Sequence, residues 1–336
     1  MEISNKIIVA VLSATLYLVN IPSAFSHSDE NATETHTTRT LSMDDVRAKY
    51  ADSNSKFVDL DGINVHYKDE GKGPVILLVH GTLGDLFDWD VWTQELLKSG
   101  FRVVRFDIPG FGLSGNIANG NYSVDRTHTL VDSLMDHVGA EKFGIAGISY
   151  GGMVVFRYAA TRTDRVTSMV LINSAGIQTA NAVKRKPKTP GEKPKRTSIF
   201  MYSPVVEKDD IVSFYDNYIN DKSKVTPEFV QRKLDFLNIQ ERDKTSIATF
   251  KLYEKGDPQR VLSHVKAPSL IMWGTANKAL DTKTASAFID ALPNACLTKL
   301  VTFESGGHYI NIERPIETVK VAQSFFLDLK SAKLCK

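Results

Sequence analysis

The 336-residue sequence has few of the features that mark metal-binding or disulfide-rich proteins. It contains only two cysteines, Cys296 and Cys335, and no CxxC spacing, which argues against a cysteine-based metal site. In an oxidising compartment the two could form a disulfide that ties the last helix to the core. Two free thiols remain the alternative.

The sequence also lacks a strong charge imbalance. Lys and Arg number 41 and Asp and Glu 39, a net charge of +2, so a nucleic-acid-binding protein is not expected. The basic residues are clustered, however, because Lys184–Arg196 holds seven of them against Glu192 alone. This segment predicts either a solvated loop or a weak contact with an anionic surface or substrate.

No apolar run is long enough to span a bilayer comfortably, and the longest, Ile7–Val19, has 13 residues. It is followed by Ala24-Phe25-Ser26, with small residues at the positions that signal peptidases favour. The sequence predicts a cleaved signal peptide over 1–26, a flexible polar leader over 27–42, and a secreted or periplasmic protein. An uncleaved membrane anchor is the alternative.

Buried strands alternate with amphipathic helices along most of the chain, which predicts a mostly parallel sheet with helices on both faces. The predicted strands are Phe57–Leu60, Ile63–Lys68, Val75–Val79, Phe101–Phe106, Phe143–Ala146, Val166–Ile172, Ser269–Trp273 and Leu297–Phe303. The alternation stops between 175 and 265, where helical patterns such as Pro227–Leu237 and Asp243–Tyr253 replace strands. We therefore expect a core of 43–174 and 266–336 and an inserted helical cap of 175–265.

The sharpest chemical signal is Gly147-Ile148-Ser149-Tyr150-Gly151-Gly152, which follows a strand and opens a helix. Small residues at 147 and 151 permit a strained turn that presents the Ser149 hydroxyl above the sheet. Serine needs a base to act as a nucleophile. The best candidate is His308, which lies after the last predicted strand and before the last helix.

An oxyanion hole is also predicted from His80-Gly81-Thr82-Leu83-Gly84, which follows the strand Val75–Val79. The donors would be the backbone N–H groups of Thr82 and of Tyr150, the residue after the nucleophile. The expectation for His80 itself is a structural role.

These motifs resemble the α/β-hydrolase superfamily, in its cap-bearing, esterase- and lipase-like branch. The resemblance covers roughly Phe57 to Leu329 and also rests on Phe106-Asp107-Ile-Pro-Gly-Phe-Gly-Leu-Ser114, Trp273-Gly274, and Gly307-His308 followed by Glu313-Arg-Pro315. It implies an α/β-hydrolase fold with an eight-stranded sheet and a cap after the sixth strand. It also implies a structural role for Asp107 in supporting the oxyanion loop.

The chain departs from the family at the catalytic acid, which usually follows the seventh strand as Trp-Gly-x-x-Asp. Here Asn277 occupies that place, and the nearest carboxylate is Asp281. Asp281 could reach back to His308, Asn277 could orient the imidazole through its amide oxygen, or the acid could be lost and catalysis be weak or absent. The position after the sixth strand holds Asn173, so no acid is found there either.

The predicted function is hydrolysis of an ester, thioester or lactone by a serine hydrolase, with a small acyl substrate and without metal or organic cofactor. C–C bond hydrolysis, cofactor-free perhydrolysis and a non-catalytic binding role are the alternatives. Leu83, Phe87 and Trp89 are candidate substrate contacts near the oxyanion loop. The cap adds aromatic residues whose orientation the sequence leaves open, among them Phe214, Tyr215 and Tyr218.

Overall fold

The computed structural model of the chain describes residues 39–177, 205–242 and 257–332. The predicted signal peptide, most of the leader, the basic segment Lys184–Arg196, the helical pattern Asp243–Tyr253 and Cys335 lie outside the described residues. Within those residues, no helix combines the length and the apolar character needed to cross a membrane.

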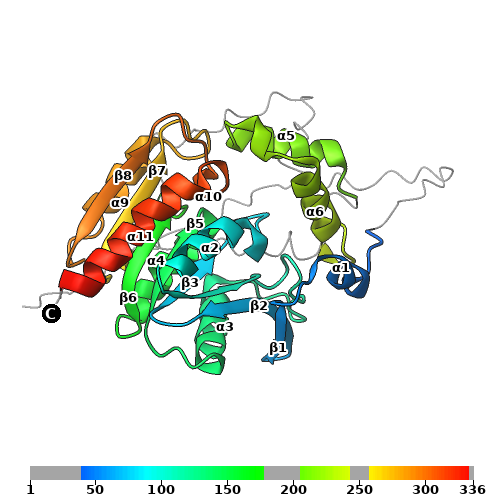
Figure 1. Cartoon of the computed structure of the whole chain (residues 1–336), viewed down its shortest axis with the longest axis horizontal. Helices are drawn as coiled ribbons and strands as arrows, with labels where there is room; N and C mark the ends of the chain where they lie inside the picture. Colours follow the sequence, from blue (N-terminus) through cyan, green and yellow to red (C-terminus); the bar gives the residue numbers. More distant parts are fainter. Residues whose placement is uncertain (1–38, 178–204, 243–256, 333–336) are drawn as a thin grey trace, which may run out of the picture. The chain divides into compact units, whose positions relative to one another are not determined.

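Eight strands form one sheet in the order β1-β2-β4-β3-β5-β6-β7-β8 (Figure 1). The strands are β1 (Lys56–Leu60), β2 (Ile63–Gly71), β3 (Val75–Val79), β4 (Arg102–Phe106), β5 (Phe143–Ile148), β6 (Val166–Ile172), β7 (Ser269–Gly274) and β8 (Thr298–Phe303). β2 runs antiparallel to both β1 and β4, and every other pair of neighbours is parallel. The expected eight-stranded, mostly parallel sheet is therefore confirmed.

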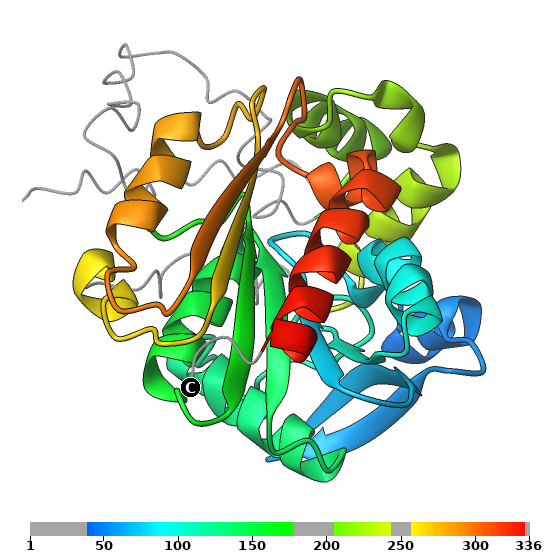
Figure 2. The ribbon, with the colours of Figure 1, turned by 60° about the vertical axis from the view of Figure 1, so that its left-hand side comes forward.

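Successive side chains of the central strands enter two separate cores, one on each face of the sheet. In β3, Leu77 and Val79 belong to one core, while Ile76 and Leu78 belong to the other. The first core is covered by α3 (Val124–His137), α4 (Tyr150–Thr161) and α9 (Thr282–Asp290), the second by α2 (Asp90–Lys98) and α11 (Pro315–Ala332). Figure 2 shows α11 crossing its face of the sheet. Because both faces of the central sheet are covered, β3, β5, β6 and β7 are buried along almost their whole length.

Between β6 and β7 the described chain forms helices only: α5 (Lys208–Tyr218), η4 (Lys222–Lys224), α6 (Pro227–Leu237) and α8 (Pro258–Leu262). The predicted helix Pro227–Leu237 is observed with the same bounds. Ile211 and Tyr215 of α5 and Val230 of α6 join the core beneath α2 and α11, so these two helices pack on the sheet domain through apolar contact.

The folded chain begins earlier than the predicted leader allows. Leu41 forms a β-bridge with Ile239, just after α6, and the Ser42 hydroxyl accepts a hydrogen bond from Asp45 N–H at the start of α1 (Met43–Tyr50). The last residues of the predicted 27–42 leader thus belong to the folded domain. Hydrogen bonds to the segment after α6 hold them in place.

A buried ion cluster fastens α6 to the loop that precedes η1 (Leu86–Trp89). The Lys233 ammonium lies 2.7 Å from Asp85 and 2.7 Å from Asp88, and Arg232 contacts the same two carboxylates. The Asp85 side chain is fully buried, and the two cations hold its pKa well below the usual range despite burial. Buried charges of this kind are strongly destabilising when one partner is removed.

We expect Lys233→Ala to lower the free energy of unfolding by about 3 kcal/mol, because two carboxylates would remain buried beside Arg232 alone. Lys224→Ala is the matched control, since Lys224 is exposed and its replacement should change stability by less than about 0.5 kcal/mol. Denaturant unfolding of the two variants measures the difference. Equal stabilities would show that the cluster does not hold the cap helix.

Candidate active site

Ser149 occupies the predicted strand-to-helix turn between β5 and α4. Its backbone is left-handed, with φ 53° and ψ −120°, a conformation that costs energy in any residue other than glycine. The glycines beside it are required by close packing, because a Cβ on Gly147 would lie 2.5 Å from the Gly151 carbonyl and one on Gly151 2.3 Å from the His80 carbonyl. The turn thus brings Ser149 against the loop that carries the predicted oxyanion donor.

His308 follows β8 in a loop that is fixed through its backbone on both sides. The His308 N–H donates to the Tyr218 carbonyl at 2.7 Å, and its carbonyl accepts from Asn173 Nδ2 at 2.7 Å. The ring is buried, with the whole residue 5% exposed. Burial disfavours the imidazolium and lowers the pKa of His308 to about 4, so the ring is a neutral base at pH 7.

Asn277 orients the His308 ring. Its Oδ1 lies 3.1 Å from His308 Nδ1 and also accepts from the N–H groups of Ala279 and Leu280 at 3.0 and 3.1 Å. Those two backbone donors determine which end of the amide is oxygen, so Nδ1 must carry the proton and Nε2 is left as the proton acceptor. This geometry supports the prediction that Asn277 orients the His308 imidazole through its amide oxygen.

Asp281 contacts Thr284 and not His308, so the alternative in which Asp281 reaches back to the histidine is wrong. The residue is exposed and caps the N-terminus of α9, where its carboxylate accepts from Thr284 N–H at 3.1 Å and from the Thr284 hydroxyl at 3.3 Å. An Asp at the N-cap position commonly accepts a hydrogen bond in this way from the backbone N–H three residues later. Asp281 therefore has a structural explanation and is not the histidine's partner.

Asn173, at the end of β6, joins the two halves of the site and was missed by sequence reasoning. Its Nδ2 donates to the carbonyls of Gly307 and His308, and its Oδ1 accepts from Gly274 N–H at 3.0 Å. The residue before it, Ile172, accepts from Ser149 N–H at 3.1 Å. The strand end that holds the nucleophile's backbone therefore also holds the histidine's. Among the described residues the Ser149 hydroxyl has no hydrogen-bond partner, which leaves it available to a substrate.

Side-chain hydrogen bonds hold three successive carbonyls of the oxyanion loop, those of Gly81, Thr82 and Leu83. Ile108 N–H donates to His80 Nε2 at 2.9 Å, so His80 Nδ1 carries the proton and donates to the Gly81 carbonyl at 2.8 Å. That carbonyl belongs to the same peptide group as the Thr82 N–H, for which no acceptor is found in the described part of the chain. His80 is structural, as expected, and it orients the group predicted to bind the oxyanion.

Two tyrosine hydroxyls fix the next two peptides of this loop. Tyr309 donates to the Thr82 carbonyl at 3.1 Å, and Tyr215 of the cap helix α5 donates to the Leu83 carbonyl at 3.0 Å. Both phenols are buried, which raises their pKa above the usual range and keeps them protonated as donors. The other predicted donor, the backbone N–H of Tyr150, belongs to the first residue of α4, directly after Ser149.

The three predicted substrate contacts lie in packed surroundings. Trp89 is fully buried and packs edge-on against Trp92 at 5.2 Å, and Leu83 is 4% exposed. Phe87 is half-buried, with Lys68 Nζ 4.6 Å from its ring centre and the centre of the tilted His66 ring 5.9 Å away. Packing explains Trp89 and Phe87 without a substrate.

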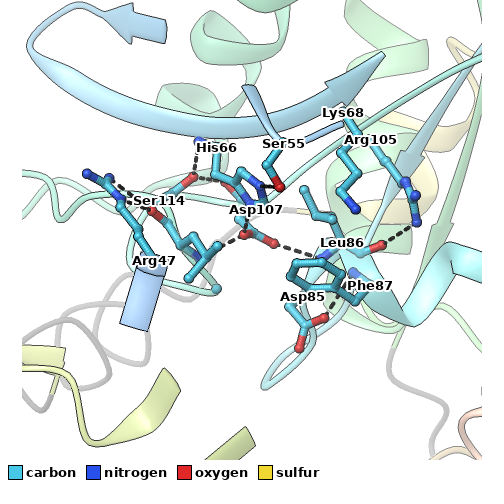
Figure 3. Close-up of polar contacts among 12 residues, drawn as sticks. Arg47, Ser55, His66, Lys68, Asp85, Leu86, Phe87, Arg105, Asp107 and Ser114 are labelled. Atoms are coloured by element: carbon cyan, nitrogen blue, oxygen red, sulfur yellow. Dashed lines mark hydrogen bonds and ion pairs between the residues drawn. The ribbon is translucent and has the colours of Figure 1, made fainter. Parts of the chain in front are cut away.

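Figure 3 shows the Asp107 carboxylate between the His66 ring and the backbone of Leu86, which begins η1 just after the oxyanion loop. Its carboxylate accepts from Leu86 N–H at 2.7 Å and Leu113 N–H at 2.8 Å and lies 2.7 Å from His66 Nδ1. The other ring nitrogen of His66 lies 3.0 Å from the Ser55 hydroxyl. The buried carboxylate thus connects β2, β4 and the loop leading to η1, in the structural role that the resemblance implies.

Within the described residues, no cluster of three or more His, Cys, Asp and Glu side chains is arranged to hold a metal ion. The residues that follow the carboxyl ends of β5, β7 and β8 are instead Ser149, Asn277 and His308, of which Asn277 and His308 are in direct contact.

Several known proteins that this chain resembles are hydrolases. A 2-hydroxy-6-oxononadienedioate/2-hydroxy-6-oxononatrienedioate hydrolase of Pseudomonas putida is 26% identical over 284 residues, which cover 77% of this chain and 92% of the relative. Haloalkane dehalogenase 2 of Mycobacterium tuberculosis is 33% identical over 123 residues, 36% of this chain and 42% of that protein. The solved meta-cleavage product hydrolase of Pseudomonas fluorescens matches with a TM-score of 0.68 and 21% identity, over 81% of this chain and 97% of that one.

The model of the alpha/beta hydrolase fold family matches residues 74–315, from the loop before β3 to the first residue of α11. This range contains Ser149, Asn277 and His308, and with the observed sheet order it shows that the chain belongs to the α/β-hydrolase fold family and is a hydrolase.

Proposed function

We propose that this hydrolase cleaves a carboxylic ester, thioester or lactone through an acyl-enzyme formed on Ser149. The observation that carries the proposal is the Asn277–His308 contact at the sheet edge where Ser149 turns. Asn277 Oδ1 accepts from His308 Nδ1, which favours the tautomer protonated there and leaves Nε2 to accept the serine proton. The N–H groups of Thr82 and Tyr150 would stabilise the developing oxyanion. Water then completes the reaction by attacking the acyl group, again with His308 as base.

C–C bond hydrolysis is the second candidate, because the relative from Pseudomonas putida is named for a 2-hydroxy-6-oxo dienedioate substrate. The same serine, histidine and oxyanion donors would serve a ketone carbon. Dehalogenation is not proposed, since in this superfamily that chemistry uses a carboxylate nucleophile, and the residue at the turn is Ser149.

Secretion is proposed from residues 1–26 alone, and contact with anionic surfaces from Lys184–Arg196 alone.

Fluorophosphonate labelling tests the nucleophile. We expect stoichiometric labelling of the wild-type protein at Ser149 and none in Ser149→Ala, together with turnover of 4-nitrophenyl acetate and butyrate by the wild type only. Ser174→Ala is a control for a neighbouring buried serine and should still be labelled. Folded wild-type protein that neither labels nor turns over an ester or a vinylogous diketone would leave only a binding role.

The rate should depend on pH through His308. The base must be neutral, and its pKa of about 4 means that kcat/KM should hold steady as pH falls from 7 and drop only as pH passes through about 4. In Asn277→Asp an anion would stand beside Nδ1, raise the pKa of His308, and move the acid limb to higher pH. Asp281→Asn should leave the limb in place. An unmoved limb in Asn277→Asp would contradict the placement of residue 277 against His308.

A further inference from the structure

We propose that the neutral Ser149–His308–Asn277 arrangement restricts this protein to acyl compounds with weakly basic leaving groups, such as phenols, enols and thiols, and makes alkyl esters poor substrates. The inference rests on the proposed acyl-transfer function and names the substrate class of that same site. It comes from what surrounds the His308 ring and from the proton that the leaving group requires.

No carboxylate among the described residues stabilises a charged His308. The Asn277 Oδ1 that faces Nδ1 is neutral and is shared with two backbone N–H donors. The buried carboxylate of Glu313 accepts through Oε2 from the N–H groups of Gly307 and Asn220. Asp281 is turned to Thr284.

Two aromatic rings and one exposed lysine are the other side chains near His308 or Asn277 that the described part of the chain provides. The rings of Tyr218 and Tyr309 lie 5.8 Å and 5.0 Å away, and Lys278 beside Asn277 is exposed. Desolvation is thus the force that acts on the imidazole, and it disfavours the protonated form.

The two steps of acylation make different demands on that protonated form. In the first, the Ser149 Oγ–acyl bond forms while the hydroxyl proton moves to His308 Nε2. In the second, the bond from the acyl carbon to the leaving group breaks. An alkoxide is too basic to leave unprotonated, so it must take the proton from a fully formed imidazolium. A phenolate, enolate or thiolate can leave as an anion while the hydroxyl proton is only partly transferred to Nε2, and that proton then passes from His308 to solvent.

The cost of the imidazolium therefore falls most heavily on alkyl esters. A triad carboxylate stabilises the imidazolium, and replacing it with an amide lowers the rate by up to about 10⁴ where the tautomer is also inverted. In this protein Asn277 still favours the His308 tautomer protonated at Nδ1, so only the negative charge of a carboxylate is missing. Substrates whose transition state carries little charge on the imidazole are affected least, as Brønsted behaviour requires.

The test is a series of acetates that share one acyl group and differ in leaving group: 4-nitrophenyl, phenyl and ethyl acetate, with phenyl thioacetate. We expect kcat/KM of the wild type to fall by at least about 10³ from 4-nitrophenyl to ethyl acetate. Asn277→Asp should raise the value for ethyl acetate at least tenfold relative to that for 4-nitrophenyl acetate. Asp281→Asn is the matched control and should leave the wild-type series unchanged.

The outcomes separate the inference from the function on which it rests. Absence of both Ser149 labelling and turnover of every acetate contradicts the proposed function. Ethyl acetate hydrolysed within tenfold of the 4-nitrophenyl ester by the wild type overturns the inference alone, whether or not the variant folds. A folded Asn277→Asp protein that accelerates all four substrates equally also overturns it.

Discussion

The left-handed backbone at Ser149 is the constraint around which the rest of the site is built. It turns the chain so sharply that the first turn of α4 lies against the loop after β3, and only glycine fits at 147 and 151. The conformation is unfavourable for serine and persists because surrounding contacts hold it. Ser149 N–H is bound to Ile172, and its carbonyl accepts from Ala175 N–H at 2.9 Å. The nucleophile is thereby pinned to the end of β6, where Asn173 also holds the histidine loop.

The opposite wall of the site depends on the buried Asp107. The oxyanion loop has no regular secondary structure of its own, so side chains must satisfy its polar backbone groups. Asp107 binds the loop at Leu86, His80 binds it at Gly81, and tyrosines bind the two carbonyls that follow. One of these tyrosines, Tyr215, belongs to the cap. The cap helices and the oxyanion loop therefore form one hydrogen-bonded unit with the sheet, and the ion cluster at Asp85 strengthens the same junction.

The sheet and the turn at Ser149 could be predicted from the sequence because both depend on local patterns. Continuous apolar runs identify strands covered on both faces, and glycines at fixed spacing identify the turn at Ser149. Residue 277 was found by its distance from Trp273, but the choice between Asn277 and Asp281 depended on a loop path that no local pattern determines. The Asp281–Thr284 cap was readable in principle. Asn173 was not, because its three hydrogen bonds reach across β7 and the loop after β8, which are about 100 and 135 residues away in sequence.

Asn277 shows how stability and catalysis compete at one position. The amide leaves its Nδ2 without a partner among the described residues, which costs about 1–3 kcal/mol for a buried donor. A carboxylate there would have the same three donors on one oxygen, and its other oxygen would lie where Nδ2 has no partner, so burial of a full charge would be poorly compensated. The neutral side chain avoids that charge and still sets the histidine's tautomer. The buried edge of the sheet thus tolerates an amide more readily than an anion. In the proposed mechanism His308 is then a base whose charged form no carboxylate among the described residues stabilises.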